Sequence, residues 1–265
     1  MSNNDLLGNI KKLRELTGVG FKDCKLALDE NKGDIEKSIE FLRKKGIAKA
    51  SKKMSRTASE GLVLAREDKG QISIIEINSE TDFVAKNKDF INFCQKISEI
   101  NFNCKGNIET LNNSKMDNGL LVKDNLVSLI AKIGEKITIG RSKTFLSSNC
   151  KIFKYHHTVV KDNISKLGVL VSIDTNDNSD QIKTFGKQLS MHIAASNPLA
   201  IDANDIDHQI IKKEEELIKE ELKNSGKNDE IIKKISQGKI NKFKNDNSLL
   251  NQQWVMEPKK TVKEI

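Results

Sequence analysis

Apolar residues recur every three or four positions through the first 46 residues, the spacing of amphipathic helices. Three short helices follow from this spacing, with apolar faces at Leu6, Ile10 and Leu13, at Phe21, Cys24 and Leu28, and at Ile35, Ile39 and Leu42. Gly18 and Gly20 separate the first two helices, Gly33 ends the second, and Asp34 is placed to cap the third. We therefore expect a small three-helix bundle, which serves either as a structural cap or as a docking module for a partner.

Beyond residue 60 the apolar period changes to two, which is typical of half-buried strands. Leu62 and Leu64 lie before the turn at 68–70, and Ile72 and Ile74 lie after it. This arrangement predicts a β-hairpin, with Ile75 and Ile77 adding a second apolar face. Further along, the pattern predicts helices at about 88–100 and 120–133 and strands at 135–146 and 150–160.

Two segments, 69–97 and 166–193, share one order: a glycine turn, an apolar strand, a polar loop and an amphipathic helix. We interpret them as a weak internal duplication of an α/β unit. The first copy carries TDFVAKN at 81–87 between its strand and its helix, where the second has only a short polar turn. The fold therefore does not require this extra segment to join strand to helix.

Residues 206–244 show two apolar stripes among many charges, separated by Asn224-Ser225-Gly226. This pattern predicts an antiparallel helical hairpin, too charged to be enclosed in a core. The pattern changes also suggest the domain boundaries: a helical module with its basic linker at 1–54, one core subdomain at 55–147, a second at 148–205 and 245–265, and the hairpin at 206–244.

Charge adds a second candidate surface. The net charge is +8, and the stretch from Arg43 to Arg56 holds seven basic residues and no acid. We expect a solvated linker at 47–60, after the third helix. The alternative is a contact with RNA or with an acidic protein face. Nucleic-acid binding is the less favoured reading, because no aromatic residue interrupts the basic run.

The sequence contains no constellation of catalytic or metal-binding residues. Four scattered cysteines form no C-x-x-C pair, and the four histidines do not complete a zinc site. The nearest match to a phosphate-binding loop, at 134–142, has the wrong spacing and lies in a strand pattern. No apolar run could cross a membrane, and the polar start argues for a cytoplasmic protein. We expect a binding protein rather than an enzyme, with no metal and no cofactor.

Several stretches closely resemble the elongation factor Ts family. They are LRELTGVGFKDCKLAL at 13–28, GDIEKSIEFLRKKGIAKASKK at 33–53, EINSETDFVAKN at 76–87, GVLVSID at 168–174, SMHIAASNP at 190–198 and VMEPKKTV at 255–262. Members of that family usually continue beyond the last motif with another strand and often a helical module, whereas this sequence stops at Ile265.

The resemblance implies an α+β fold. Its parts would be an N-terminal bundle similar to ubiquitin-associated domains, a duplicated α/β core with antiparallel sheets, and an inserted antiparallel coiled-coil hairpin. It implies that the protein releases GDP from its partner, the GTPase elongation factor Tu. The hairpin offers a surface for a homodimer or for a second partner contact.

The resemblance also implies the residues that meet the GTPase. In the family the Asp and Phe of the TDFV loop act on the partner; here they are Asp82 and Phe83, flanked by Thr81 and Val84. The Phe wedges between helices near the magnesium and phosphate sites. The remaining contacts correspond to Arg14, Phe21 and Lys22 in the first module and to Tyr155 and His157 in a Tyr-x-His motif.

Two alternatives stay open from the residues alone. Phe83 could instead be a staple that packs its loop onto the following helix, since most Phe side chains are buried. The whole protein could be an RNA- or ribosome-binding adaptor that uses the basic segment 43–56.

Overall fold

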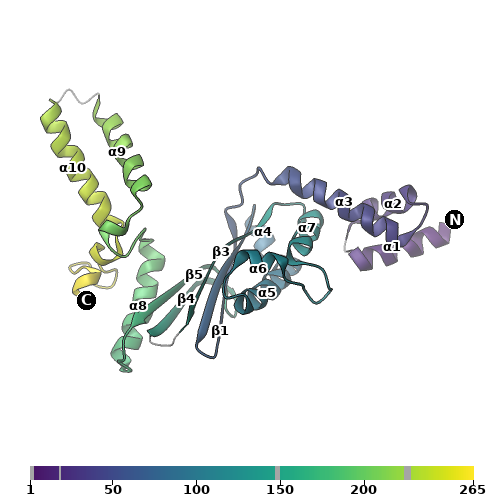
Figure 1. Cartoon of the computed structure of the whole chain (residues 1–265), viewed down its shortest axis with the longest axis horizontal. Helices are drawn as coiled ribbons and strands as arrows, with labels where there is room; N and C mark the ends of the chain where they lie inside the picture. The colour runs from purple at the N-terminus through teal and green to yellow at the C-terminus, as the bar shows by residue number, and fades with distance from the viewer. Residues whose placement is uncertain (1–2, 18, 147–149, 224–227) are drawn as a thin grey trace. The chain divides into compact units, whose positions relative to one another are not determined.

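The structure, a computed structural model, describes residues 3–17, 19–146, 150–223 and 228–265 (Figure 1). Within these residues the fold is a mixed α/β structure with ten α-helices and one five-stranded antiparallel sheet. The chain divides into two compact units: 1–152 with 156–168 and 172–176, and 153–155 with 169–171 and 177–265. None of the described helices combines the length and the apolar character needed to cross a lipid bilayer.

The first unit begins with three helices, α1 (Asn3–Thr17), α2 (Phe21–Glu30) and α3 (Ile35–Lys53). They enclose a small core made of Ile10, Leu13, Cys24, Ala27, Leu28 and Leu42. The predicted cap is confirmed, because Asp34 Oδ1 accepts a hydrogen bond from the Lys37 amide at 3.0 Å. Gly33 has a φ of 83°, which suits the turn after α2. Gly18 lies outside the described residues.

Helix α3 is longer than the sequence suggested. We expected it to end near residue 46 and a linker to follow at 47–60, but the helix continues through Lys53. Leu42, Gly46 and Ala50 recur every four residues and are buried. They form a stripe of mostly small residues that the surrounding charges obscured. A Cβ atom added to Gly46 would lie 3.3 Å from Ala131 Cβ, so α3 packs closely on α7 (Val122–Ile133).

The strands form a single sheet in the order β3-β2-β1-β5-β4. They run over β1 Glu60–Asp68, β2 Gln71–Ser79, β3 Ile137–Leu146, β4 Cys150–Lys161 and β5 Ile164–Asp174. The predicted β1–β2 hairpin is confirmed, with Leu62 opposite Ile77 and Leu64 opposite Ile75. We expected more than one antiparallel sheet; the strands are antiparallel as expected, but they form one sheet, because β1 also pairs with β5 through Val63–Ser165 and Leu64–Ile164. This pairing satisfies backbone groups that an edge strand would leave open.

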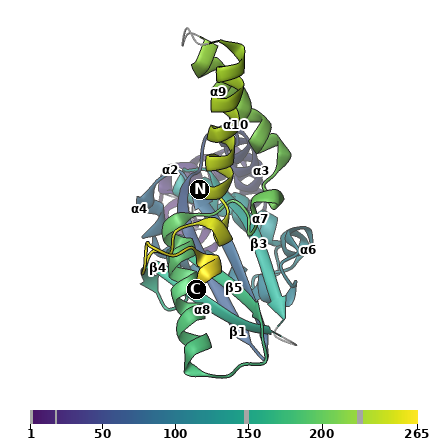
Figure 2. The ribbon, with the colours of Figure 1, turned by 90° about the vertical axis from the view of Figure 1, so that its left-hand side faces the viewer.

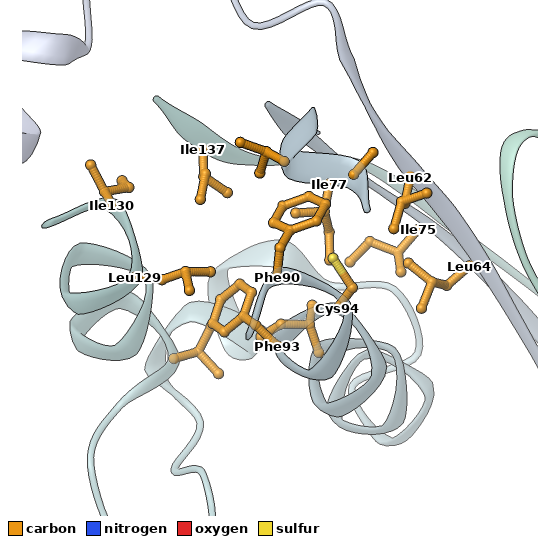
Figure 3. Close-up of a cluster of buried hydrophobic side chains, with 14 of the residues drawn as sticks. Leu62, Leu64, Ile75, Ile77, Phe90, Phe93, Cys94, Leu129, Ile130 and Ile137 are labelled. Atoms are coloured by element: carbon orange, nitrogen blue, oxygen red, sulfur yellow. The ribbon is translucent and has the colours of Figure 1, made fainter. Parts of the chain in front are cut away.

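One face of the sheet is covered by α4 (Asp82–Ala85), α5 (Lys88–Asn103), α6 (Ile108–Asn113) and α7. Figure 3 shows Phe90 and Cys94 of α5 directed at the strand residues Ile75 and Ile77, whereas Phe93 lies beside Leu129 of α7. Burial raises the pKa of the Cys94 thiol, so this cysteine stays protonated and unreactive. Helix α6 was not predicted, because one and a half turns carry too few apolar positions to show a period.

The second unit is mainly helical, with α8 (Asp180–Ser196), α9 (His208–Lys223) and α10 (Asp229–Asp246). Helices α9 and α10 lie side by side in Figure 1 and Figure 2, and their shared core contains Ile211, Ile218, Leu222 and Ile240. Lys239 Nζ of α10 pairs with Glu221 of α9 at 2.6 Å. The two predicted apolar stripes are thus two adjacent helices, and the coiled-coil geometry stays a prediction. The predicted break at 224–226 lies outside the described residues.

A buried histidine holds the last segment of the second unit against α8. His192 has no exposed surface and stacks on Trp254 at a centroid distance of 5.2 Å. Its Nδ1 accepts from the Val255 amide at 3.3 Å, and its Nε2 lies 3.1 Å from Gln252 Oε1. An accepting Nδ1 requires the neutral ring with its proton on Nε2. Burial lowers the pKa of His192 below its ordinary value.

This network predicts acid sensitivity. The unfolded chain binds a proton at His192 below about pH 6.5, whereas the folded chain resists it until a lower pH. The stabilising effect is therefore complete above pH 6.5 and is lost as the pH falls toward the folded pKa. The slope for one group is at most about 1.4 kcal/mol per pH unit. Denaturant unfolding of wild type and His192→Gln between pH 5 and 8 should show a steeper loss of stability on acidification in wild type, by up to this amount. Equal slopes, or NMR titration of the His192 ring near pH 6.5, would contradict the prediction.

Candidate functional site

The TDFV segment forms a short projection between β2 and α5. Helix α4 is a single turn whose buried residues are Val84 and Ala85, with 5% and 1% exposed surface. Phe83 lies between these anchors and Asp82, and 78% of its side chain is exposed. Since so little of Phe83 touches the protein, the staple interpretation is wrong. Val84 was a candidate contact, but in this structure it is an anchor in the core.

Two carboxylates, Glu135 and Glu80, accept hydrogen bonds where the chain leaves β2 and enters this segment. Glu135 accepts hydrogen bonds from the Thr81 amide at 3.0 Å and from Thr81 Oγ1 at 2.8 Å. Glu80 accepts from the Lys136 amide and from the Arg56 guanidinium, the latter at 3.2 Å. The Lys136 amide, followed by the Arg56 charge, holds the pKa of Glu80 below its usual range. Both carboxylates are therefore acceptors in a fixed arrangement.

Asp82 has a looser environment. Its carboxylate is 41% exposed and pairs with Lys86 Nζ of the same loop at 3.4 Å. Exposed pairs of this kind contribute little to stability. A donor from another molecule could therefore replace Lys86 at small cost. Asp82 and Phe83 together present one anion and one large apolar side chain to the solvent.

The other candidate residues lie on different elements. Arg14 is in the last turn of α1, and Phe21 and Lys22 begin α2. All three are exposed, and 45% of Phe21 is accessible. We assigned Phe21 to the apolar face of α2, yet this accessibility places it at the edge of that face. An exposed aromatic followed directly by a cation is suited to an acidic and partly apolar surface.

The Tyr-x-His motif lies on β4. Tyr155 is half-buried, and His157 is exposed. Residues two apart in a strand point to the same face, so the two rings share one side of β4. Thr158 follows with a φ of 53°, which is an unusual conformation for a β-branched residue.

The described residues hold no group of three or more His, Cys, Asp or Glu side chains arranged to bind a metal ion. The TDFV segment instead presents an exposed aromatic side chain, Phe83, beside the partly exposed carboxylate of Asp82. Such a projection is suited to displacing elements of another protein.

Comparison with known proteins supplies the family. The family model for elongation factor TS matches residues 80–265, which is well over half of the chain and includes the whole TDFV segment. The chain belongs to the elongation factor Ts family. The sequence resemblance is therefore confirmed, and with it a role as a translation elongation factor in protein biosynthesis.

Similar proteins agree with this assignment over almost the whole length. An elongation factor Ts of Methylobacterium sp. (strain 4-46) is 41% identical over 257 residues, covering 97% of this chain and 83% of the relative. That of Brucella anthropi is 42% identical over 253 residues, covering 96% and 83%. That of Rickettsia felis is 40% identical over 257 residues, again covering 97% and 83%. The similarity thus extends to the first helices, which the family model does not match.

For this elongation factor Ts family member, sequence reasoning missed the carboxylates that support the projection. Glu135 is 54 residues from Thr81 and follows the left-handed Gly134, with a φ of 88°, at the end of α7. One signal was available: a Gly-Glu-Lys turn between a helix and a strand often places polar side chains at a sheet end. That signal alone could not identify Thr81 as the partner.

Proposed function

We propose that this protein is a guanine-nucleotide exchange factor that binds elongation factor Tu carrying GDP and promotes GDP release. The observation that carries the proposal is the 78% exposed Phe83 on a loop held by Val84 and Ala85 on one side and by Thr81 on the other. Exposed aromatics on an ordered support are typical anchors of protein interfaces. Membership of the elongation factor Ts family supports elongation factor Tu as the partner.

The mechanism needs no catalytic residue. A GTPase holds GDP through a phosphate-cradling loop and a magnesium ion, and magnesium tolerates little departure from octahedral geometry. An aromatic side chain inserted beside this site displaces the elements that hold the ion. Burying Phe83 would contribute about 2 to 3 kcal/mol toward that displacement. Asp82, adjacent and partly exposed, would orient the loop by accepting hydrogen bonds from the partner.

The cycle closes by thermodynamic coupling. If the factor weakens GDP binding by some ratio, GDP weakens binding of the factor by the same ratio. An incoming nucleotide therefore expels the factor and frees it for another round. The protein acts on an exchange barrier and is not an enzyme in the bond-making sense.

The direct test is release of labelled GDP from the cognate elongation factor Tu, with and without this protein. The proposal expects faster release that saturates with factor concentration. Release that is unchanged at any concentration of folded factor would reject it.

We predict that the first three helices contribute affinity rather than rate. Replacing Phe21 and Lys22 with alanine removes an exposed aromatic and a cation from the start of α2, at little cost to the bundle core. The factor concentration at half-maximal GDP release should rise about tenfold, the factor that corresponds to 1.4 kcal/mol, while the maximal rate stays unchanged. A lower maximal rate with unchanged half-saturation would contradict this division of roles. Glu30→Ala, an exposed change at the far end of α2, serves as the control.

The alternative of an RNA- or ribosome-binding adaptor has less support from the structure. Several cations of the segment 43–56 are engaged within the protein. Lys45 and Lys49 both bind Asp23, at 3.0 and 2.8 Å, and Arg43 binds Asp124 at 3.0 Å. Cations used in this way are less available to phosphates.

A further inference from the structure

We propose that Glu135 is the positioning residue for the loop that presents Phe83. This inference rests on the proposed function and adds to it a residue outside the TDFV segment. Glu135 accepts from both hydrogen-bond donors of Thr81, the amide at 3.0 Å and the hydroxyl at 2.8 Å. Two hydrogen bonds to one carboxylate fix the direction in which the chain leaves β2, because each oxygen restrains a different atom.

The turn that carries Glu135 is itself held from several sides. Helix α7 ends at Ile133, and its C-cap, Gly134, has a positive φ of 88° that lets the chain reverse directly into Glu135. The next residue, Lys136, donates its amide to Glu80 and its Nζ to the carbonyls of Met54 and Arg56, each at 2.7 Å. The carbonyl of Gly134 accepts from Lys53 Nζ. Glu135 is therefore a support that is already ordered before any partner binds.

The loop needs this support in the residues that precede Phe83, because its other anchors lie after Phe83. Its hydrophobic anchors, Val84 and Ala85, both follow Phe83 in the chain. Helix α4 is only one turn long, and a single turn is not stable by itself. Ahead of Phe83, the hydrogen bonds of Thr81 to Glu135 supply the restraint, together with Ser79 Oγ, which donates to the Thr81 carbonyl at 3.0 Å. Without Glu135 the loop would be anchored mainly by the two hydrophobic residues that follow Phe83.

A loosely held aromatic is a poor wedge. Ordering a loop at the moment of binding consumes free energy that would otherwise displace the partner. Removing Glu135 should therefore lower the maximal rate of GDP release, since the displacement is the step that suffers. The half-saturating concentration should change less, because the contacts of α1 and α2 are untouched.

The test compares Glu135→Ala and Glu135→Gln with the wild type. Glu135→Ala removes both acceptors and should lower the maximal GDP-release rate about tenfold, the factor for 1.4 kcal/mol. Glu135→Gln keeps one acceptor oxygen at nearly the same size and should give an intermediate rate. In the free protein, hydrogen exchange of the Thr81 amide should accelerate in the same order. Glu109→Ala, an exposed change on α6, should alter neither quantity.

The outcomes separate this inference from the proposed function. A folded wild type that does not accelerate GDP release rejects the function. A wild type that does, together with a Glu135→Ala variant of unchanged maximal rate and unchanged Thr81 exchange, rejects the role of Glu135. Unfolding midpoints are measured for every variant. If Glu135→Ala unfolds, the rate and exchange of Glu135→Gln decide: wild-type values for both overturn the inference.

Discussion

Replacing Phe83 with alanine should slow maximal GDP release from elongation factor Tu by about 30- to 150-fold. This range converts the 2 to 3 kcal/mol expected from burying a Phe side chain at 1.36 kcal/mol per factor of ten. The free energy of unfolding should change by less than about 0.5 kcal/mol, as for other surface substitutions, because 78% of the side chain is exposed. Activity and stability thus separate at one residue.

Both quantities are measured on the same preparation, exchange at saturating factor and unfolding in denaturant. Phe83→Leu is the matched control: it keeps an apolar side chain of smaller size and should retain part of the rate. A stable Phe83→Ala variant with normal exchange would remove Phe83 from the mechanism. A strongly destabilised one would show that the loop depends on the ring for its fold.

Replacing Phe90 with alanine should have the opposite effect. Phe90 is seven positions after Phe83, in the first turn of α5, and none of its surface is exposed. It lies at the centre of the main core, against the apolar face of β1 and β2 (Figure 3). Truncating a buried Phe leaves a cavity and costs about 3 to 5 kcal/mol. Because domains are typically stable by only about 5 to 15 kcal/mol, this variant would lose a large part of its free energy of unfolding.

The measurement is denaturant unfolding of Phe90→Ala beside Phe83→Ala. The midpoint should fall strongly for the first variant and stay near wild type for the second, with similar slopes. Phe90→Leu, which fills more of the cavity, should give an intermediate midpoint. A loss below about 1 kcal/mol for Phe90→Ala would mean that the core can repack around the gap.

Local patterns predicted much of the fold. The Asp34 cap, the β1–β2 register and the apolar faces of α1 and α3 follow from spacings of a few residues, where one period dominates. The comparison of the two repeats singled out the segment containing Phe83 as dispensable for joining strand to helix. The structure agrees: residues 175–179 alone connect β5 to α8, whereas 80–87 connect β2 to α5.

The remaining features depend on contacts between distant segments. Among the described residues, β1 pairs with β5 at Val63–Ser165 and Leu64–Ile164, a short pairing that no local sequence pattern indicates. The extent of α3 depends on small residues meeting α7, a packing fit that charge composition hides. The bond from Glu135 to Thr81 spans 54 positions, and any of several carboxylates could have made it. The sequence did not indicate the hydrogen bonds of His192, because its partner Gln252 lies 60 positions further on.

The continuous α3 has an entropic consequence. If a flexible tether replaced the end of α3, α1 and α2 would still move through a large volume after the Phe83 loop had bound the partner. Their effective concentration at their own contact site on the partner would then be low. A helix that runs to Lys53, and ends with Met54 and Arg56 bonded to Lys136, removes most of that freedom in advance. Once the Phe83 loop has bound, the contact made by α1 and α2 therefore forms with little further loss of chain entropy. The Phe83 loop and the surface of α1 and α2 can in this way bind with the avidity of one larger surface, while each binds weakly enough to dissociate.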